Sequence, residues 1–149
     1  MRYLRLLDPG WGIMSVRIVA GVILVTSGWQ KWAKGLTSTT EAFAKMGIPA
    51  PSVAVPFVAG LELFGGALLL VGLFTRVLGL LFAVQFVVIT FYVKSLAEGL
   101  GPLRLDLMML AGSLLLLFAG PGRAAIDRAW LERPGDAEAP SRGDVRRVA

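Results

Sequence analysis

Residues 51–73 read PSVAVPFVAGLELFGGALLLVGL, and Glu62 is the only ionisable residue in this apolar stretch. A helix of this length can cross a bilayer, because about 20 residues span a hydrocarbon core of about 30 Å. An ionised carboxylate is costly at such a position, so it usually faces a protein interior and often marks a functional site. Glu62 is therefore the first candidate site residue.

The composition places the whole chain in a membrane. Of its 149 residues, 56% are hydrophobic, and the mean hydropathy is +0.71. Soluble domains have an apolar content of about 45–50%. Backbone groups in lipid must satisfy their hydrogen bonds within the segment, which favours helices. We therefore predict an all-α integral membrane protein that contacts the lipid bilayer.

Four apolar stretches predict a four-helix bundle. The expected helices cover residues 11–32, 51–73, 77–93 and 102–119, within a transmembrane domain of residues 1–133. An even number of spans places both termini on one side. That side carries nine basic residues and the other carries five, so the positive-inside rule predicts cytoplasmic termini. Residues 134–149 are rich in Pro, Gly, Ala and charge, and we expect a disordered cytoplasmic tail.

Two short interfacial helices are expected outside these spans. The segment Ser38-Thr39-Thr40-Glu41 fits a capping box that opens a helix through Met46, and Gly47 fits its end. Phe43 and Met46 lie on one face, so this helix is either a connector against the bundle or a lid over a site. The second helix is predicted from Arg123 to Arg133, anchored by Trp130.

The residue types exclude several kinds of chemistry. The chain has no His and no Cys, so we expect no Cys-ligated iron–sulfur cluster, no His-ligated haem and no Cys/His metal site. The net charge of +5 lies mostly in loops and tail, where it sets topology, and nucleic-acid binding is not expected. No local motif specifies a free-standing enzyme, and no catalytic residue is assigned.

Arg17 interrupts the first predicted helix as Glu62 interrupts the second. By helical spacing, Gly28 and Lys31 continue the stripe of Arg17, and Gly66 continues that of Glu62. Small residues let transmembrane backbones approach closely, so the two stripes are predicted to face each other. At the estimated depths Arg17 can reach Glu62, and this pair could either fix the helix register or line a pocket.

Three further polar residues extend this candidate ligand site. Lys31 and Asp106 continue inward-facing stripes at the outer rim, and Gln85 lies midway along the third predicted helix. With Glu62 they could form a polar mouth above an apolar cavity, which suits an amphiphile such as a quinone. Gln85 could donate to a ligand carbonyl or merely hydrogen-bond across helices. The candidate ligand-binding residues are thus Arg17, Lys31, Glu62, Gln85 and Asp106.

Several short sequence elements between about Leu7 and Asp127 occur in an order that indicates a family resemblance. They are Arg17 with Gly21, Gly28-Trp29-Gln30-Lys31, Met46-Gly47-Ile48-Pro49-Ala50-Pro51, Glu62 with Gly65-Gly66, Gly72 with Thr75-Arg76, Asp106, and Gly120-Pro121-Gly122-Arg123 before Asp127. In these the sequence resembles the DoxX family of small four-helix bacterial membrane proteins. The resemblance implies a protein of the bacterial cytoplasmic (inner) membrane, often associated with redox systems.

These observations lead to one principal interpretation and two alternatives. We expect a membrane subunit that binds a quinone-like or other lipidic ligand and acts with a redox partner, at most as part of a quinone-linked oxidoreductase. Arg17 and Glu62 would polarise or exchange protons with the head group, and Lys31 and Asp106 would gate the mouth. The alternatives are a structural or assembly subunit without ligand chemistry and a small lipid or solute transporter. Homo-oligomerisation is left open.

Overall fold

The computed structural model describes residues 9–93 and 103–127, and this part of the chain contains helices and no strand. The all-α fold class is thereby confirmed. The elements are α1 (Pro9–Ala33), α2 (Leu36–Lys45), α3 (Pro51–Gly60), η2 (Leu61–Gly65), α4 (Gly66–Val71), α5 (Thr75–Val88), η3 (Ile89–Val93) and α6 (Arg104–Ala119). The π-helical turns η2 and η3 join α3 to α4 and extend α5, so both continue a longer helix.

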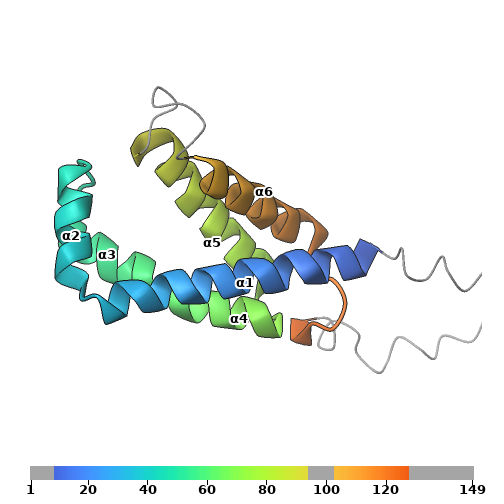
Figure 1. Ribbon diagram of the computed structural model, residues 1–149. Coiled ribbons are helices and arrows are strands. Elements are labelled where there is room, and N and C mark those ends of the chain that lie inside the picture. The colour runs from blue at the N-terminus through green and yellow to red at the C-terminus, as the bar shows by residue number, and fades with distance from the viewer. Residues whose placement is uncertain (1–8, 94–102, 128–149) are drawn as a thin grey trace, which may run out of the picture.

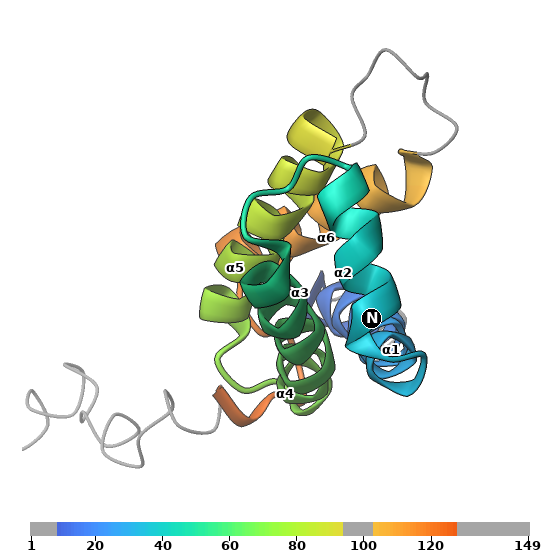
Figure 2. The same cartoon turned by 90° about the vertical axis from the view of Figure 1, so that its left-hand side faces the viewer.

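The long helices form two close pairs. In one pair α1 lies along α3–η2–α4, and in the other α5 lies along α6 (Figure 1). The two pairs meet near the turn from α4 to α5 and diverge toward the end where α2 lies. Figure 2 looks onto that end, where α2 stands beside α3. The apolar core lies where the pairs meet, and it includes Leu24, Leu69, Phe82 and Leu116.

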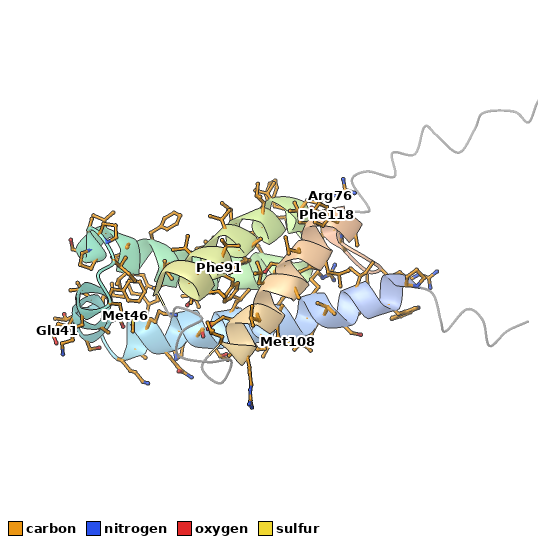
Figure 3. All side chains as sticks on the ribbon, turned by 90° about the horizontal axis from the view of Figure 1, so that it is seen from above. Glu41, Met46, Arg76, Phe91, Met108 and Phe118 are labelled. Carbon is orange, nitrogen blue, oxygen red and sulfur yellow. The ribbon has the colours of Figure 1, made fainter. Side chains whose placement is uncertain are left out.

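Two helical stretches are long and apolar enough to cross a membrane. They are Pro9–Ala33 and Pro51–Val71, and Thr75–Phe91 is a shorter apolar helix. Large apolar side chains on the outer faces are exposed, among them Val53 at 70% and Phe118 at 76%. Figure 3 shows Phe118 and Met108 directed away from the helix pairs (Figure 3). Exposed apolar side chains of this kind are typical of helices that face lipid rather than water.

Glycines allow the first pair to pack backbone against backbone. A Cβ atom on Gly28 would lie 2.5 Å from the backbone nitrogen of Leu63, and one on Gly66 would lie 2.9 Å from that of Val25. No side chain fits at either place. The predicted contact between the stripe of Gly28 and the stripe of Gly66 is therefore confirmed.

The ends of the helices show where local sequence signals were misleading. The observed long helices begin and end within two residues of the predicted bounds. The predicted capping box at Ser38 is wrong, because α2 begins at Leu36 and the Ser38 hydroxyl donates to the carbonyl of Gly35 at 3.1 Å. Gly35 has a φ of 84°, which starts the helix earlier than the Ser-Thr-Thr-Glu segment suggests. Gly47 ends this helix as predicted, with a φ of 73°.

Three expectations fall outside the described residues. They are the beginning of the fourth helix at Pro102, the anchoring of an interfacial helix by Trp130, and the tail at 134–149. The second interfacial helix was predicted to begin at Arg123, which is wrong, because residues 123–125 are not helical and the helical residues begin at 126.

The contact of Gly28 with Leu63 can be tested by adding one methyl group. Gly28→Ala should lower the free energy of unfolding by about 1–3 kcal/mol, because α1 and η2 must move apart. Gly12→Ala on the same helix is the control, since a Cβ there meets nothing within 4 Å. Thermal unfolding in detergent, followed by circular dichroism, measures both variants. Equal midpoints for the two would contradict the close packing.

Candidate functional site

One buried carboxylate joins three helical segments. Glu62 lies in η2 and is 5% exposed. Its Oε2 atom forms an ion pair with Nζ of Lys31 on α1, and its Oε1 atom accepts a hydrogen bond of 3.0 Å from Nε2 of Gln85 on α5. Both carboxylate oxygens therefore have donors, one from each helix pair. A buried charge of this kind needs such partners.

The local sequence explains why Lys31 reaches Glu62. Lys31 lies three residues after Gly28, on the same face of α1, and Gly28 brings that face against the backbone of Leu63. The π-helical turn Leu61–Gly65 widens the second helix at this level. Such turns inside α-helices are frequent at functional sites. The glycine contact and the wide turn together place Lys31 beside Glu62.

A cavity of about 750 Å³ adjoins this cluster, between the two helix pairs. Its wall includes residues of α1, α3, η2, α5, η3 and α6, and it also includes Phe43 of α2 and Met46, which follows α2. Figure 3 shows Met46 on the inner side of the α2 region, with Glu41 on the opposite side. All lining side chains are apolar except those of Ser27, Lys31, Glu62, Gln85 and Asp106. The cavity is thus apolar with one polar region.

The cavity opens at exposed side chains that α3 and α5 contribute to its wall. Phe57 of α3 is 65% exposed and Val84 of α5 is 56% exposed, although both line the cavity. Side chains that line a cavity and are also exposed lie at its opening. Because the exposed lining is apolar, this opening suits lipid acyl chains better than water.

The structure brings four of the five candidate residues to this cavity. Lys31 and Gln85 each contact Glu62, and Asp106, in the first turn of α6, is 8% exposed and lines the same cavity. Their role in binding a ligand stays a prediction. Ser27 was not predicted, although it lies four residues before Lys31 and so shares its helical face. That spacing was the signal that could have identified it.

The predicted pair between Arg17 and Glu62 is wrong. Arg17 is 1% exposed, and its two terminal nitrogens donate to the carbonyls of Pro121 at 2.6 Å and Ala124 at 3.0 Å. It does not line the cavity, and it lies roughly 21 Å from Lys31 along α1. The depth estimate failed because it could not include the segment after α6, which turns back and offers these carbonyls. Lys31 then meets Glu62 instead.

Arg17 belongs to a second polar cluster, at the end of the molecule opposite α2. There the carboxylate of Asp127 accepts hydrogen bonds from the backbone nitrogens of Phe74 and Thr75, both 2.8 Å, and so caps the start of α5. The backbone nitrogen of Asp127 donates to the carbonyl of Gly72 at 3.0 Å. The Gly120–Asp127 segment is thereby fixed to the turn between α4 and α5.

The same segment also contacts the start of α1. The backbone nitrogen of Arg123 donates to the carbonyl of Gly10 at 3.2 Å, and its guanidinium lies 5.8 Å from the centre of the Trp11 ring. We call residues 120–127 with Arg17 the return-segment cluster. In this cluster the side chains of Arg17 and Asp127 bind backbone groups of the chain itself. The cluster therefore has a structural role, which is to hold residues 120–127 against the helices.

Comparison with known proteins assigns the chain to a family. The family model described as DoxX matches residues 12–95, more than half of the chain. The chain belongs to the DoxX family. No solved structure matches it with significance.

Curated relatives cover most of this DoxX-family chain. The protein named "Putative oxidoreductase CatD" of Bacillus subtilis (strain 168) is 32% identical, over 78% of this chain and 84% of that protein. The inner membrane protein YqjF of Escherichia coli (strain K12) is 34% identical, over 78% and 90%. The membrane protein Rv3486 of Mycobacterium tuberculosis (strain ATCC 25618 / H37Rv) is 29% identical, over 81% and 82%. The chain is thus a DoxX-family membrane protein.

Metal-binding geometry is absent from the part of the chain that the structure describes. No group of three or more His, Cys, Asp and Glu residues in residues 9–93 and 103–127 could hold a metal ion. The polar groups at the cavity are an ammonium, two carboxyl groups, an amide and a hydroxyl. This set can bind and orient an organic head group, and it can give or take protons.

The return-segment cluster predicts that Arg17 matters for stability more than for the cavity. Arg17→Ala should lower the thermal midpoint, because two carbonyls lose their donors at a cost of about 1–3 kcal/mol each. Arg104→Ala is the matched control, since Arg104 is exposed. Thermal unfolding in detergent measures the difference. An Arg17→Ala midpoint equal to that of Arg104→Ala would contradict the structural role.

Proposed function

We propose that this DoxX-family protein is a four-helix membrane bundle that binds a quinone-like or other lipidic ligand and works with a redox partner protein. The observation that carries the proposal is the Lys31–Glu62–Gln85 cluster at the wall of an apolar cavity. In this function Lys31 and Glu62 polarise the ligand head group or exchange protons with it. Asp106, which is buried and lines the same cavity, adds a second carboxyl group to the site.

The size and lining of the cavity support a small amphiphilic ligand. Sites for small molecules have volumes of about 300–1,000 Å³, apolar walls and a few convergent polar groups. The cavity of about 750 Å³ has these properties. An isolated ion pair in an apolar interior gains little stability over apolar packing. Binding of a ligand head group accounts for an ion pair of Lys31 and Glu62 at this place better than stability does.

The membrane setting supports a ligand taken from the bilayer. The apolar spans, the exposed apolar faces and the relative YqjF, an inner membrane protein, favour the bacterial cytoplasmic membrane. In the proposed orientation both termini are cytoplasmic, which places α2 and the cavity toward the outer side. The exposed lining of α3 and α5 would then open the cavity to acyl chains.

The redox role is supported by chemistry and by one relative. The Bacillus subtilis relative carries the name "Putative oxidoreductase CatD". The present chain has no His and no Cys, so its own side chains supply binding and proton exchange, and the ligand with a partner protein supplies electron transfer. This division of work suits a membrane subunit of a quinone-linked oxidoreductase.

A structural or assembly role is the second candidate, because the same cluster ties α1, η2 and α5 together. In that case the ion pair fixes the register of the helices and the cavity holds only bulk lipid. The two candidates differ in whether a ligand copurifies with the protein.

The proposal predicts a bound quinone in protein purified in mild detergent from its native membrane. An organic extract should show near-stoichiometric quinone in the oxidised-minus-reduced ultraviolet difference spectrum, normalised to lipid. Glu62→Gln should lose most of it, because the charged partner of Lys31 is removed. Glu41→Gln is the matched control, since Glu41 lies on the exposed face of α2.

Thermal unfolding of both variants checks that they remain folded. Quinone at the bulk-lipid level in the folded wild-type protein would overturn the redox proposal. That result would favour a role in assembly or transport.

Filling the cavity should also lower the ligand content of the purified protein, without changing a charged residue. Val58→Trp places a large ring in the cavity, whereas Val53→Trp on the same helix places it on the exposed outer face. We expect Val58→Trp to reduce the ligand content at least about fivefold, while Val53→Trp keeps the wild-type content, as a filled pocket excludes its ligand. Extraction and mass spectrometry of the purified variants measure this. Equal ligand content in both variants would place the ligand elsewhere.

A further inference from the structure

The helix α2 belongs to the cavity wall without being packed into the bundle. Phe43 of α2 lines the cavity, as do Met46 and Ile48, which follow this helix. None of the ten residues of α2, all of which the structure describes, is buried. Figure 3 shows Glu41 on the side of this region opposite to Met46. The apolar face of α2 thus covers part of the cavity, and Glu41 lies on the outer face.

A glycine with a positive φ stands near each end of α2. Gly35, directly before the helix, has a φ of 84° and a ψ of 136°, and Gly47, two residues after it, has a φ of 73°. Glycine adopts either sign of φ at little cost, which other residues do not. No atom of the described chain lies within 4 Å of a Cβ built on either glycine. Both positions therefore have the conformational freedom and the space of a hinge.

The helix α2 is held over the cavity by apolar contacts. Its side-chain hydroxyls bond within its own turns, Ser38 to the carbonyl of Gly35 and Thr40 to that of Leu36. In the described part of the chain its contacts are mainly with α3, and no hydrogen bond or ion pair joins the two helices. Segments with few buried contacts open at a lower free energy than a packed core.

From this arrangement we infer that α2 is a lid, which opens and closes over the cavity about Gly35 and Gly47. The lid controls the access of water to the polar groups of Lys31 and Glu62, while the exposed lining of α3 and α5 is the route for acyl chains. This inference rests on the proposed ligand site and adds its regulation. Proton exchange with a bound head group then takes place when α2 is open.

The movement of α2 can be measured with pairs of spin labels, because the natural chain has no Cys. Glu41→Cys with Met108→Cys joins α2 to α6, and Val19→Cys with Met108→Cys joins α1 to α6 as the reference pair. All three side chains are exposed. Double electron–electron resonance on the full-length protein in nanodiscs should give two distance populations for the α2 pair and one for the reference pair. A single α2 population as narrow as the reference would overturn the inference.

The hinge is tested by adding one methyl group at Gly35. Gly35→Ala should raise the ratio of the open to the closed population at least about fivefold, because the observed φ and ψ are unfavourable for alanine. Gly12→Ala is the matched control, since its Cβ meets nothing within 4 Å and its φ is not positive. An unchanged ratio in folded Gly35→Ala would overturn the inference.

Access to the cavity is measured with a thiol at Ser27, which lines the cavity one turn before Lys31. The cationic, water-soluble reagent 2-(trimethylammonium)ethyl methanethiosulfonate should modify Ser27→Cys at least about fivefold faster in the Gly35→Ala background than in the Gly12→Ala background. Ser38→Cys on the exposed face of α2 is the control thiol and should react equally in both. Equal rates for Ser27→Cys in the two backgrounds would overturn the control of access.

These measurements need no ligand, so they separate the lid from the proposed function. Two α2 populations in a protein that carries quinone only at the bulk-lipid level would support the lid and overturn the quinone ligand. One α2 population in a protein with near-stoichiometric quinone would overturn the lid and leave the ligand site. The wild-type label pairs decide about the lid even where Gly35→Ala does not fold.

Discussion

The burial of the Glu62 carboxylate is the constraint on which the rest of the structure depends. A carboxylate inside an apolar bundle must be compensated by charge and hydrogen bonds. Lys31 can compensate it only because Gly28 lets α1 touch the backbone of η2. Gln85 extends the compensation to the second helix pair. The cavity lies next to this polar contact, where the two pairs begin to diverge.

The two ends of the molecule have different chemistry, and each contains residues that belong to the family resemblance. At the α2 end, Lys31, Glu62 and Asp106 surround a space that nothing in the described chain fills. At the other end, Arg17 and Asp127 bind backbone groups and fill the space with the chain itself. Gly72 belongs to this second end, since a Cβ there would lie 2.5 Å from a terminal nitrogen of Arg17. One end is therefore closed by the chain itself, and the other contains a cavity with polar groups in its wall.

Local patterns predicted the long helices and four of the five polar residues that line the cavity. Hydropathy locates long helices because the apolar run must match the bilayer thickness, and the 3–4 spacing identified the facing stripes of Gly28 and Glu62. The partner of Arg17 could not be predicted in this way. Its acceptors are the backbone carbonyls of Pro121 and Ala124, which carry no side-chain signal and are more than 100 residues away. The start of α2 was missed for a similar reason, because it depends on the positive φ of Gly35.

The return-segment cluster also has a consequence for how the protein is made. The acceptors of Arg17 leave the ribosome about 100 residues after Arg17 itself. Until then Arg17 on α1 lacks the two carbonyl groups that accept its hydrogen bonds. The helices can form one by one, but this end of the molecule closes only after α6 and the residues that follow it are in place. Biogenesis therefore has a late step, and a chain that ends before Gly120 has no means of completing it.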